Sequence, residues 1–164
     1  MGKETKKTGP KYPAKGYFGI GILNAENEQN IGTLWRSAYI LGASFIFTIG
    51  AKYKKQSTDV VKAWSKIPLY SYIDFEDFYS HIPHDCKVVA VEMDERGMEI
   101  CEYEHPLRCI YLLGCESAGM GKNVMDRCHD KIFLPGHYSL NVAVAGSVVI
   151  YDRYSKIGGA LPGR

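Results

Sequence analysis

The sequence predicts an α/β domain built on a mostly parallel sheet with helices on both faces. Apolar runs of strand length alternate along the chain with segments whose apolar residues recur at helical spacing. Loops rich in Gly, Asn, Ser or Glu follow three of the apolar runs, at residues 24–30, 114–121 and 135–140. Ligands of such sheets bind beyond the carboxyl ends of the strands, so these loops are the candidate site.

Six short runs rich in β-branched or aromatic residues are predicted strands. They are residues 17–23, 44–50, 68–73, 87–93, 108–114 and 131–135. Between them lie predicted helices at 30–42, 58–66, 74–82 and 123–128. The first helix has the clearest pattern, with one apolar stripe, Asn30 as the expected N-cap and Gly42 as the expected stop.

The apolar run at 142–151 fits a buried strand or a buried helix, and periodicity does not decide between them. It follows Ser139, Leu140 and Asn141, a polar and turn-prone segment that could be an ordinary cap or a binding loop.

Length and composition indicate one soluble globular domain at 17–164, preceded by a flexible basic tail at 1–16. The net charge is only +2, but lysines gather in the tail and at residues 52–55, where they could bind a polyanion or be merely solvated. Five cysteines without a C-x-x-C pair favour reduced thiols in the cytoplasm. No metal-ligand spacing and no stretch of membrane-spanning length is present.

The loop "LLGCESAGMGK" fails as a phosphate-binding loop. Four residues separate Gly114 from Gly119, but Met120 stands where a Walker A loop needs Lys. An acid at Glu116 would also repel a phosphate. The glycines instead indicate a tight turn that approaches something closely, or a plain strand-to-helix turn.

Arg36 lies off the apolar stripe of the first predicted helix, about one and a half turns after Asn30. Near the N-terminus an Arg opposes the helix dipole, so local stability does not explain it. A surface ion pair could, and so could a bidentate phosphate contact.

Three segments together resemble, in order, the motifs of the SpoU-type RNA methyltransferases of the SPOUT superfamily. They are "NAENEQNIGTLWRSAYILGAS", "LLGCESAGM" and "IFLPGHYSLNVAVAGSVVIYDRY". The resemblance covers about residues 17–158. It implies that the run from Val142 is a helix and that the preceding segment forms a deep C-terminal trefoil knot.

The resemblance also implies S-adenosylmethionine as cofactor, leaving S-adenosylhomocysteine as product, with no metal. The implied cofactor-binding residues come from three segments: Val91, Gly114, Glu116, Gly119, Leu134, Ser139 and Leu140. The implied catalytic residues are Arg36, Ser139, Asn141, Asn30 and Glu116. The expected assembly is a homodimer with the active site at the subunit interface.

The expected reaction is methyl transfer to a ribose 2′-hydroxyl of RNA, with tRNA as the leading substrate and rRNA as the alternative. An Arg is an unsuitable base because its pKa exceeds about 12. We therefore expect Arg36 to clamp phosphate and stabilise the forming alkoxide. A knotted RNA-binding protein without catalysis, and a nucleotide-binding protein, are the competing classes.

Overall fold

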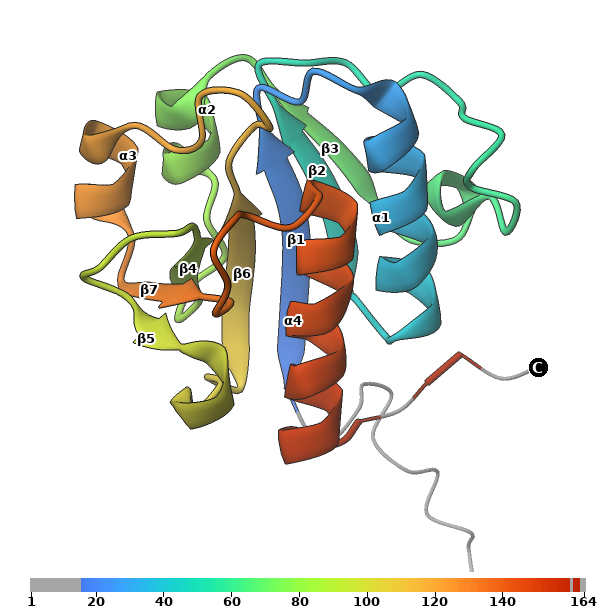
Figure 1. Cartoon of the computed structure of the whole chain (residues 1–164). Helices are drawn as coiled ribbons and strands as arrows, with labels where there is room; N and C mark the ends of the chain where they lie inside the picture. Colours follow the sequence, from blue (N-terminus) through green and yellow to red (C-terminus); the bar gives the residue numbers. More distant parts are fainter. Residues whose placement is uncertain (1–15, 160, 163–164) are drawn as a thin grey trace, which may run out of the picture.

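A computed structural model describes residues 16–159 and 161–162, so the predicted basic tail, apart from Gly16, lies outside the described residues. One sheet runs through the centre, in the strand order β3-β2-β1-β6-β4-β7-β5 (Figure 1). Every pairing between these strands is parallel. The strands are β1 (Tyr17–Leu23), β2 (Phe45–Ile49), β3 (Leu69–Tyr72), β4 (Lys87–Val91), β5 (Met98–Glu99), β6 (Arg108–Leu113) and β7 (Asp130–Phe133).

Helices cover both faces of the sheet, as predicted (Figure 1). Helices α1 (Glu28–Ile40) and α4 (Val142–Ile157) share one apolar core with the sheet, and α2 (Phe75–Ser80) and α3 (Lys122–Arg127) share the other. Strand β6 shows why both faces are filled: Tyr111 and Leu113 enter the first core, whereas Ile110 and Leu112 enter the second.

Two predicted helix details are wrong. The α1 N-cap is Asn27, whose side chain accepts from the Gln29 amide, so the helix begins one turn earlier than the apolar stripe suggested. Where a helix was predicted at 58–66, the structure has only the 3₁₀ turn η1 (Ala63–Ser65). There Lys62 has a left-handed φ of 52° and Asp59 Oδ1 accepts the Ala63 amide, which interrupts a regular helix.

The strand β5 and the following 3₁₀ turn η2 (Ile100–Glu102) were not predicted. Strand β5 has two residues, too few for an alternating pattern. It extends the sheet edge by pairing with β7.

The ambiguous run is the helix α4, as the resemblance implied. Asn141 caps it by accepting from the amides of Ala143 and Val144. Its small residues allow close packing on α1, since a Cβ added at Gly146 would lie 2.4 Å from Leu34 Cδ1. The trefoil knot stays a prediction.

A buried polar cluster fastens the second half of α4 to the start of β6. Arg153 donates to the carbonyls of Pro106 and Leu107, at 2.6 and 2.9 Å. His105 lies between the Tyr111 hydroxyl, 2.5 Å from Nδ1, and Asp152, 2.8 Å from Nε2. We call His105, Tyr111, Asp152 and Arg153 the base network.

Burial sets the protonation states in this network. It raises the pKa of Tyr111 and lowers the pKa of His105, although the bond to Asp152 favours the imidazolium. The hydrogen bonds then fit a neutral His105 that accepts from Tyr111 at Nδ1 and donates to Asp152 from Nε2.

Candidate functional site

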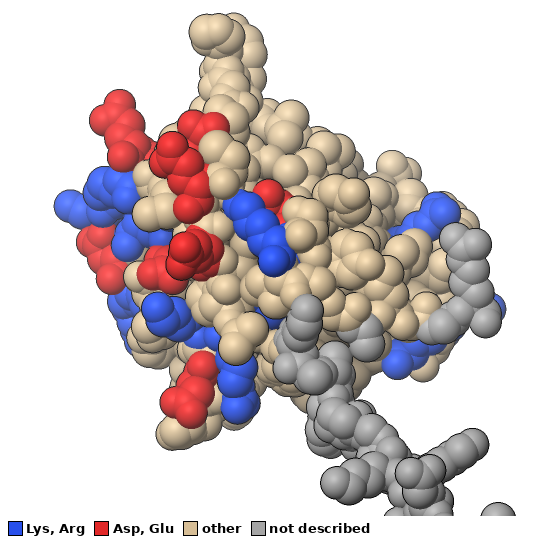
Figure 2. Space-filling view, turned by 90° about the horizontal axis from the view of Figure 1, so that it is seen from below, with Lys and Arg blue, Asp and Glu red and all other residues tan. Residues whose placement is uncertain are grey.

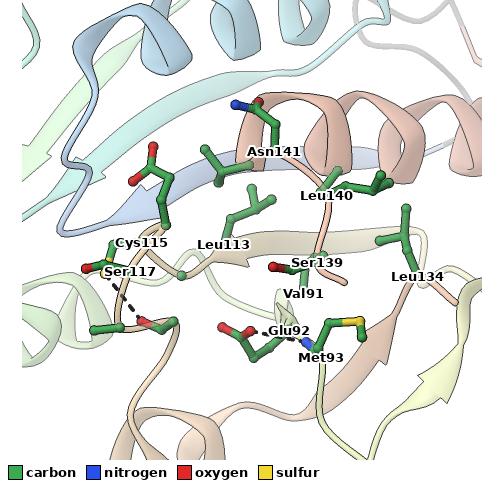
Figure 3. Close-up of a pocket in the computed structure, with 16 residues that line it drawn as sticks. Val91, Glu92, Met93, Leu113, Cys115, Ser117, Leu134, Ser139, Leu140 and Asn141 are labelled. Carbon is green, nitrogen blue, oxygen red and sulfur yellow. Dashed lines mark hydrogen bonds between the residues drawn. The ribbon is translucent and has the colours of Figure 1, made fainter. Parts of the chain in front are cut away.

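A pocket of about 480 Å³ opens at the carboxyl ends of β4 and β6 (Figure 3). One wall comes from the end of β4, a second from the loop after β6, and a third from the segment between β7 and α4. The lining residues are 91–93, 113–119, 134, 139–142 and 145. The pocket therefore forms where the parallel sheet predicts a ligand site.

All seven residues that the resemblance assigned to the cofactor line this one pocket. They are Val91, Gly114, Glu116, Gly119, Leu134, Ser139 and Leu140. Figure 3 shows Val91, Leu134, Ser139 and Leu140 around the same hollow, although they come from separate segments.

The loop after β6 is as tight as its glycines predicted. The Gly119 amide donates to the Cys115 carbonyl at 3.1 Å, and Gly119 has a φ of 62°. A Cβ added at Gly114 would lie 2.6 Å from the Gly119 carbonyl carbon. Side chains at these two positions would therefore distort the loop or fill the pocket.

Three of the predicted catalytic residues form a hydrogen-bonded chain. Asn141 Nδ2 donates to Asn30 Oδ1 at 3.0 Å, and Asn30 Nδ2 donates to Glu116 Oε1 at 2.5 Å. Asn141 Oδ1 accepts from the first amides of α4, which fixes which way its amide points. We call Asn30, Glu116 and Asn141 the site network. It joins all three motifs beside the pocket.

Glu26 lies next to the site network and was not identified from the sequence. Its amide donates to Glu116 Oε2 at 3.4 Å, and its carboxylate accepts from the Ser117 hydroxyl. Its place in the loop at 24–30, already a candidate site loop, was the available signal.

Glu92 was also missed. It follows Val91 directly at the end of β4, lines the pocket, and accepts from the Met93 amide at 3.1 Å (Figure 3). The strand was predicted to continue to Met93, so Glu92 counted as strand rather than loop.

The sequence model of the SpoU rRNA Methylase family matches residues 18–151. The chain belongs to this family. No curated protein of similar sequence was found.

Several solved structures share the fold of this chain. One, described as giving insights into the 2-OH methylation of C/U34 on tRNA, is 24% identical with a TM-score of 0.74 and covers 87% of this chain and 97% of its own. An AdoMet-bound rRNA methyltransferase from Sinorhizobium meliloti is 19% identical with a TM-score of 0.75, covering 88% of this chain and 58% of its own. A TrmH/SpoU tRNA modifying enzyme from A. aeolicus is 17% identical with a TM-score of 0.75, covering 85% and 74%.

Of the residues that the family resemblance marked as catalytic, Arg36 alone lies away from the pocket and the site network. It is the ninth residue of α1 and is exposed, so the expectation that it stands at the positive end of its helix is wrong. The helix begins earlier than predicted, and the dipole effect fades within the first turn. Within the described residues, its guanidinium forms no hydrogen bond or ion pair.

No group of three potential metal ligands occurs within residues 16–159 and 161–162. In the same part of the chain, none of the helices combines the length and the apolar character that crossing a membrane requires. All five cysteines are free thiols.

Proposed function

We propose that this protein is a cytoplasmic S-adenosylmethionine-dependent methyltransferase that modifies a ribose 2′-hydroxyl of RNA, with tRNA as substrate. One observation carries the proposal. The three segments that resemble the family's motifs converge on a single pocket, and Asn30, Glu116 and Asn141 join those segments beside it.

The pocket suits the cofactor in size and chemistry. Its volume lies in the range of small-ligand sites. Leu113, Leu134 and Leu140 offer apolar contact for an adenine ring, and the 114–119 loop offers backbone groups. Bound there, the cofactor supplies an electrophilic methyl group on a sulfonium.

The chain's own task is mainly to position the acceptor hydroxyl. Ser139 and Asn141 are two positions apart in the sequence. Both line the pocket and both are exposed. The Asn141 amide is held between the α4 amides and Asn30, so it loses little freedom when a substrate binds.

In a homodimer, Arg36 would reach such a site from the second subunit. On α4, Val144, Val148 and Tyr151 are 47%, 40% and 60% exposed and form one apolar stripe. This stripe borders a hollow that includes Thr33 of α1, and Thr33 lies on the same exposed side of α1 as Arg36. A homodimer packed through this surface would bury the stripe and bring Arg36 to the interface.

The dimer is tested by sedimentation at micromolar concentration, which should give twice the chain mass. A monomer that is stable and active at that concentration would overturn the shared site. In the dimer, Arg36 would clamp an RNA phosphate and stabilise charge on the acceptor oxygen rather than remove its proton.

A basic surface supports RNA as the substrate. Lysines 52, 54, 55, 62 and 66 are all exposed in and after the segment that follows β2. Lys55 lies 4.2 Å from the centre of the Trp64 ring, and Asp59 is buried with its carboxylate bonded internally. On the face that Figure 2 shows, Lys and Arg but no Asp or Glu are visible at the right, where α1 and this segment lie in Figure 1, while Lys54 pairs with Glu28 at 3.1 Å.

Two observations bear on which RNA is modified. The structure described for tRNA methylation is almost entirely covered by this chain, whereas the Sinorhizobium rRNA methyltransferase is much longer than the part that matches. This favours tRNA. The name of the family favours rRNA as the second candidate.

The deciding experiment incubates the dimer with labelled cofactor and either bulk tRNA or ribosomal subunits, followed by nucleoside mapping. We expect label in tRNA, at a nucleotide whose 3′ phosphodiester resists alkali because its 2′-oxygen is methylated. Label confined to ribosomal RNA would move the substrate to the second candidate. Calorimetric binding of ATP but not of S-adenosylmethionine would overturn the function.

A further inference from the structure

The pocket contains acidic side chains and no basic one. Its titratable lining residues are Glu92, Cys115 and Glu116, and no Lys, Arg or His of the described part of the chain borders it. Carboxylates are charged at neutral pH. The pocket thus presents negative charge to whatever it binds.

The two carboxylates are held differently. Glu116 receives hydrogen bonds from Asn30 Nδ2 and the Glu26 amide, so both of its oxygens are engaged in the site network. Glu92 receives one, from the Met93 amide to Oε1, and Oε2 has no donor within the described residues. Glu92 therefore keeps an oxygen for a ligand.

Glycines make room for that free oxygen. A Cβ added at Gly114 would lie 2.6 Å from Glu92 Oε2, and one added at Gly119 would lie 2.9 Å from it. The carboxylate of Glu92 is thus packed against the loop that forms the second wall of the pocket. It is half-buried, so its charge is less screened than a surface charge would be.

We propose that Glu92 determines the preference of this pocket for the positively charged sulfonium cofactor over its neutral thioether product. The inference rests on the proposed function. In the transfer, the S–CH₃ bond breaks and its electron pair returns to sulfur, while an O–CH₃ bond forms and the hydroxyl proton passes to solvent water. Cofactor and product then differ by one methyl group and one positive charge.

Glu92 attracts that charge before transfer and loses the attraction afterwards. The contribution to selectivity is on the order of tenfold for a carboxylate several ångströms away in a partly desolvated site. The product is then released more readily, which limits inhibition by product.

The test is calorimetry on the dimer with three ligands: S-adenosylmethionine, S-adenosylhomocysteine and sinefungin, in which an amine places a positive charge where the sulfonium stands. Wild-type protein should bind the two cations more tightly than the neutral product. Glu92→Gln should weaken both cations about five- to tenfold and leave the product affinity unchanged. Glu95→Gln is the matched control, because Glu95 is exposed and does not line the pocket.

Each outcome is decisive. Equal weakening of all three ligands in Glu92→Gln would show a hydrogen-bonding role and overturn charge selection. An unchanged ratio of affinities would overturn the inference while leaving the proposed function intact. Failure of the wild-type dimer to bind any of the three would instead defeat the proposed function.

Discussion

The two ends of helix α4 are held by polar networks of opposite character. At its start, Asn141 bonds to Asn30, and Asn30 to Glu116, on a surface that water reaches. In its second half, Arg153 and His105 are buried, and their polar atoms are bonded to carbonyls, a hydroxyl and a carboxylate. Both networks tie α4 to segments far away in the sequence.

The two networks differ in burial, so we expect the base network to affect stability and the site network to affect activity. A buried group that loses its partner keeps the full cost of being out of water, so breaking the base network should destabilise the fold. An exposed group that loses its partner is rehydrated at little cost, so breaking the site network should mainly affect the chemistry. Variants at the two ends of α4, and at Arg36 on the neighbouring helix α1, test this contrast.

The largest effect is expected at Arg153. Arg153→Ala leaves the Pro106 carbonyl without its donor, leaves the Leu107 carbonyl with the Tyr17 amide alone, and removes packing over the Phe18 ring, 4.9 Å from the guanidinium carbon. The free energy of unfolding should fall by about 2–5 kcal/mol, because a long buried side chain is truncated and a carbonyl loses its donor. Urea denaturation measures this loss, while the turnover of the protein that remains folded stays near wild type. Arg153→Lys should recover little, because a compact ammonium lacks the planar fork with which the guanidinium spans the two carbonyls. A loss below about 1 kcal/mol would show that the network does not hold the fold.

Arg36→Ala should act in the opposite way. Removing one electrostatic group from a transition state lowers turnover by roughly 10²–10³, while the loss of an exposed side chain costs under about 1 kcal/mol of stability. Arg36→Lys should restore little activity because an ammonium lacks the planar fork. Single-turnover methylation of saturating tRNA by folded dimers measures this, and near wild-type rates would refute the assignment.

A pair of substitutions at Asn141 separates its two tasks. Asn141→Ala removes the cap of α4 and should cost about 1 kcal/mol in unfolding free energy. Asn141→Asp keeps the cap acceptor but loses the donor to Asn30 and adds a charge near Glu116. It should therefore retain stability and lose most of the activity. Equal stability losses in the two variants would mean that the cap contributes nothing.

The smallest effect is a pH dependence of stability from His105. Burial lowers the pKa of His105 in the folded protein, so the unfolded chain binds more protons below its own pKa of about 6.5. The stability that this group contributes is present above that pH and is lost as the pH falls toward the folded-state pKa. Denaturation midpoints between pH 5 and 8 should show this decline, and His105→Gln should flatten it. A decline of the same size in His105→Gln would assign the effect to other groups.

The strands show how much of the fold local pattern can predict. Each long strand was visible as a run of β-branched or aromatic residues, and the buried stripe of α1 followed from helical spacing. The errors occur where two local structures are about equally favourable. Asn27 and Asn30 are both good caps, and the 58–66 segment has an apolar side yet is bent by Asp59 and Lys62.

Sequence patterns alone predicted the alternation of strands and helices, the family, and seven of the residues that line the pocket. Those features depend on residues a few positions apart in the sequence, or on three motifs taken together. The folded chain is needed to see that Asn30 meets partners 86 and 111 positions away, that Arg153 is buried, and that Glu92 faces Gly114 and Gly119. These contacts follow from the strand order, which places β6 between β1 and β4, and no local period encodes which strands become neighbours.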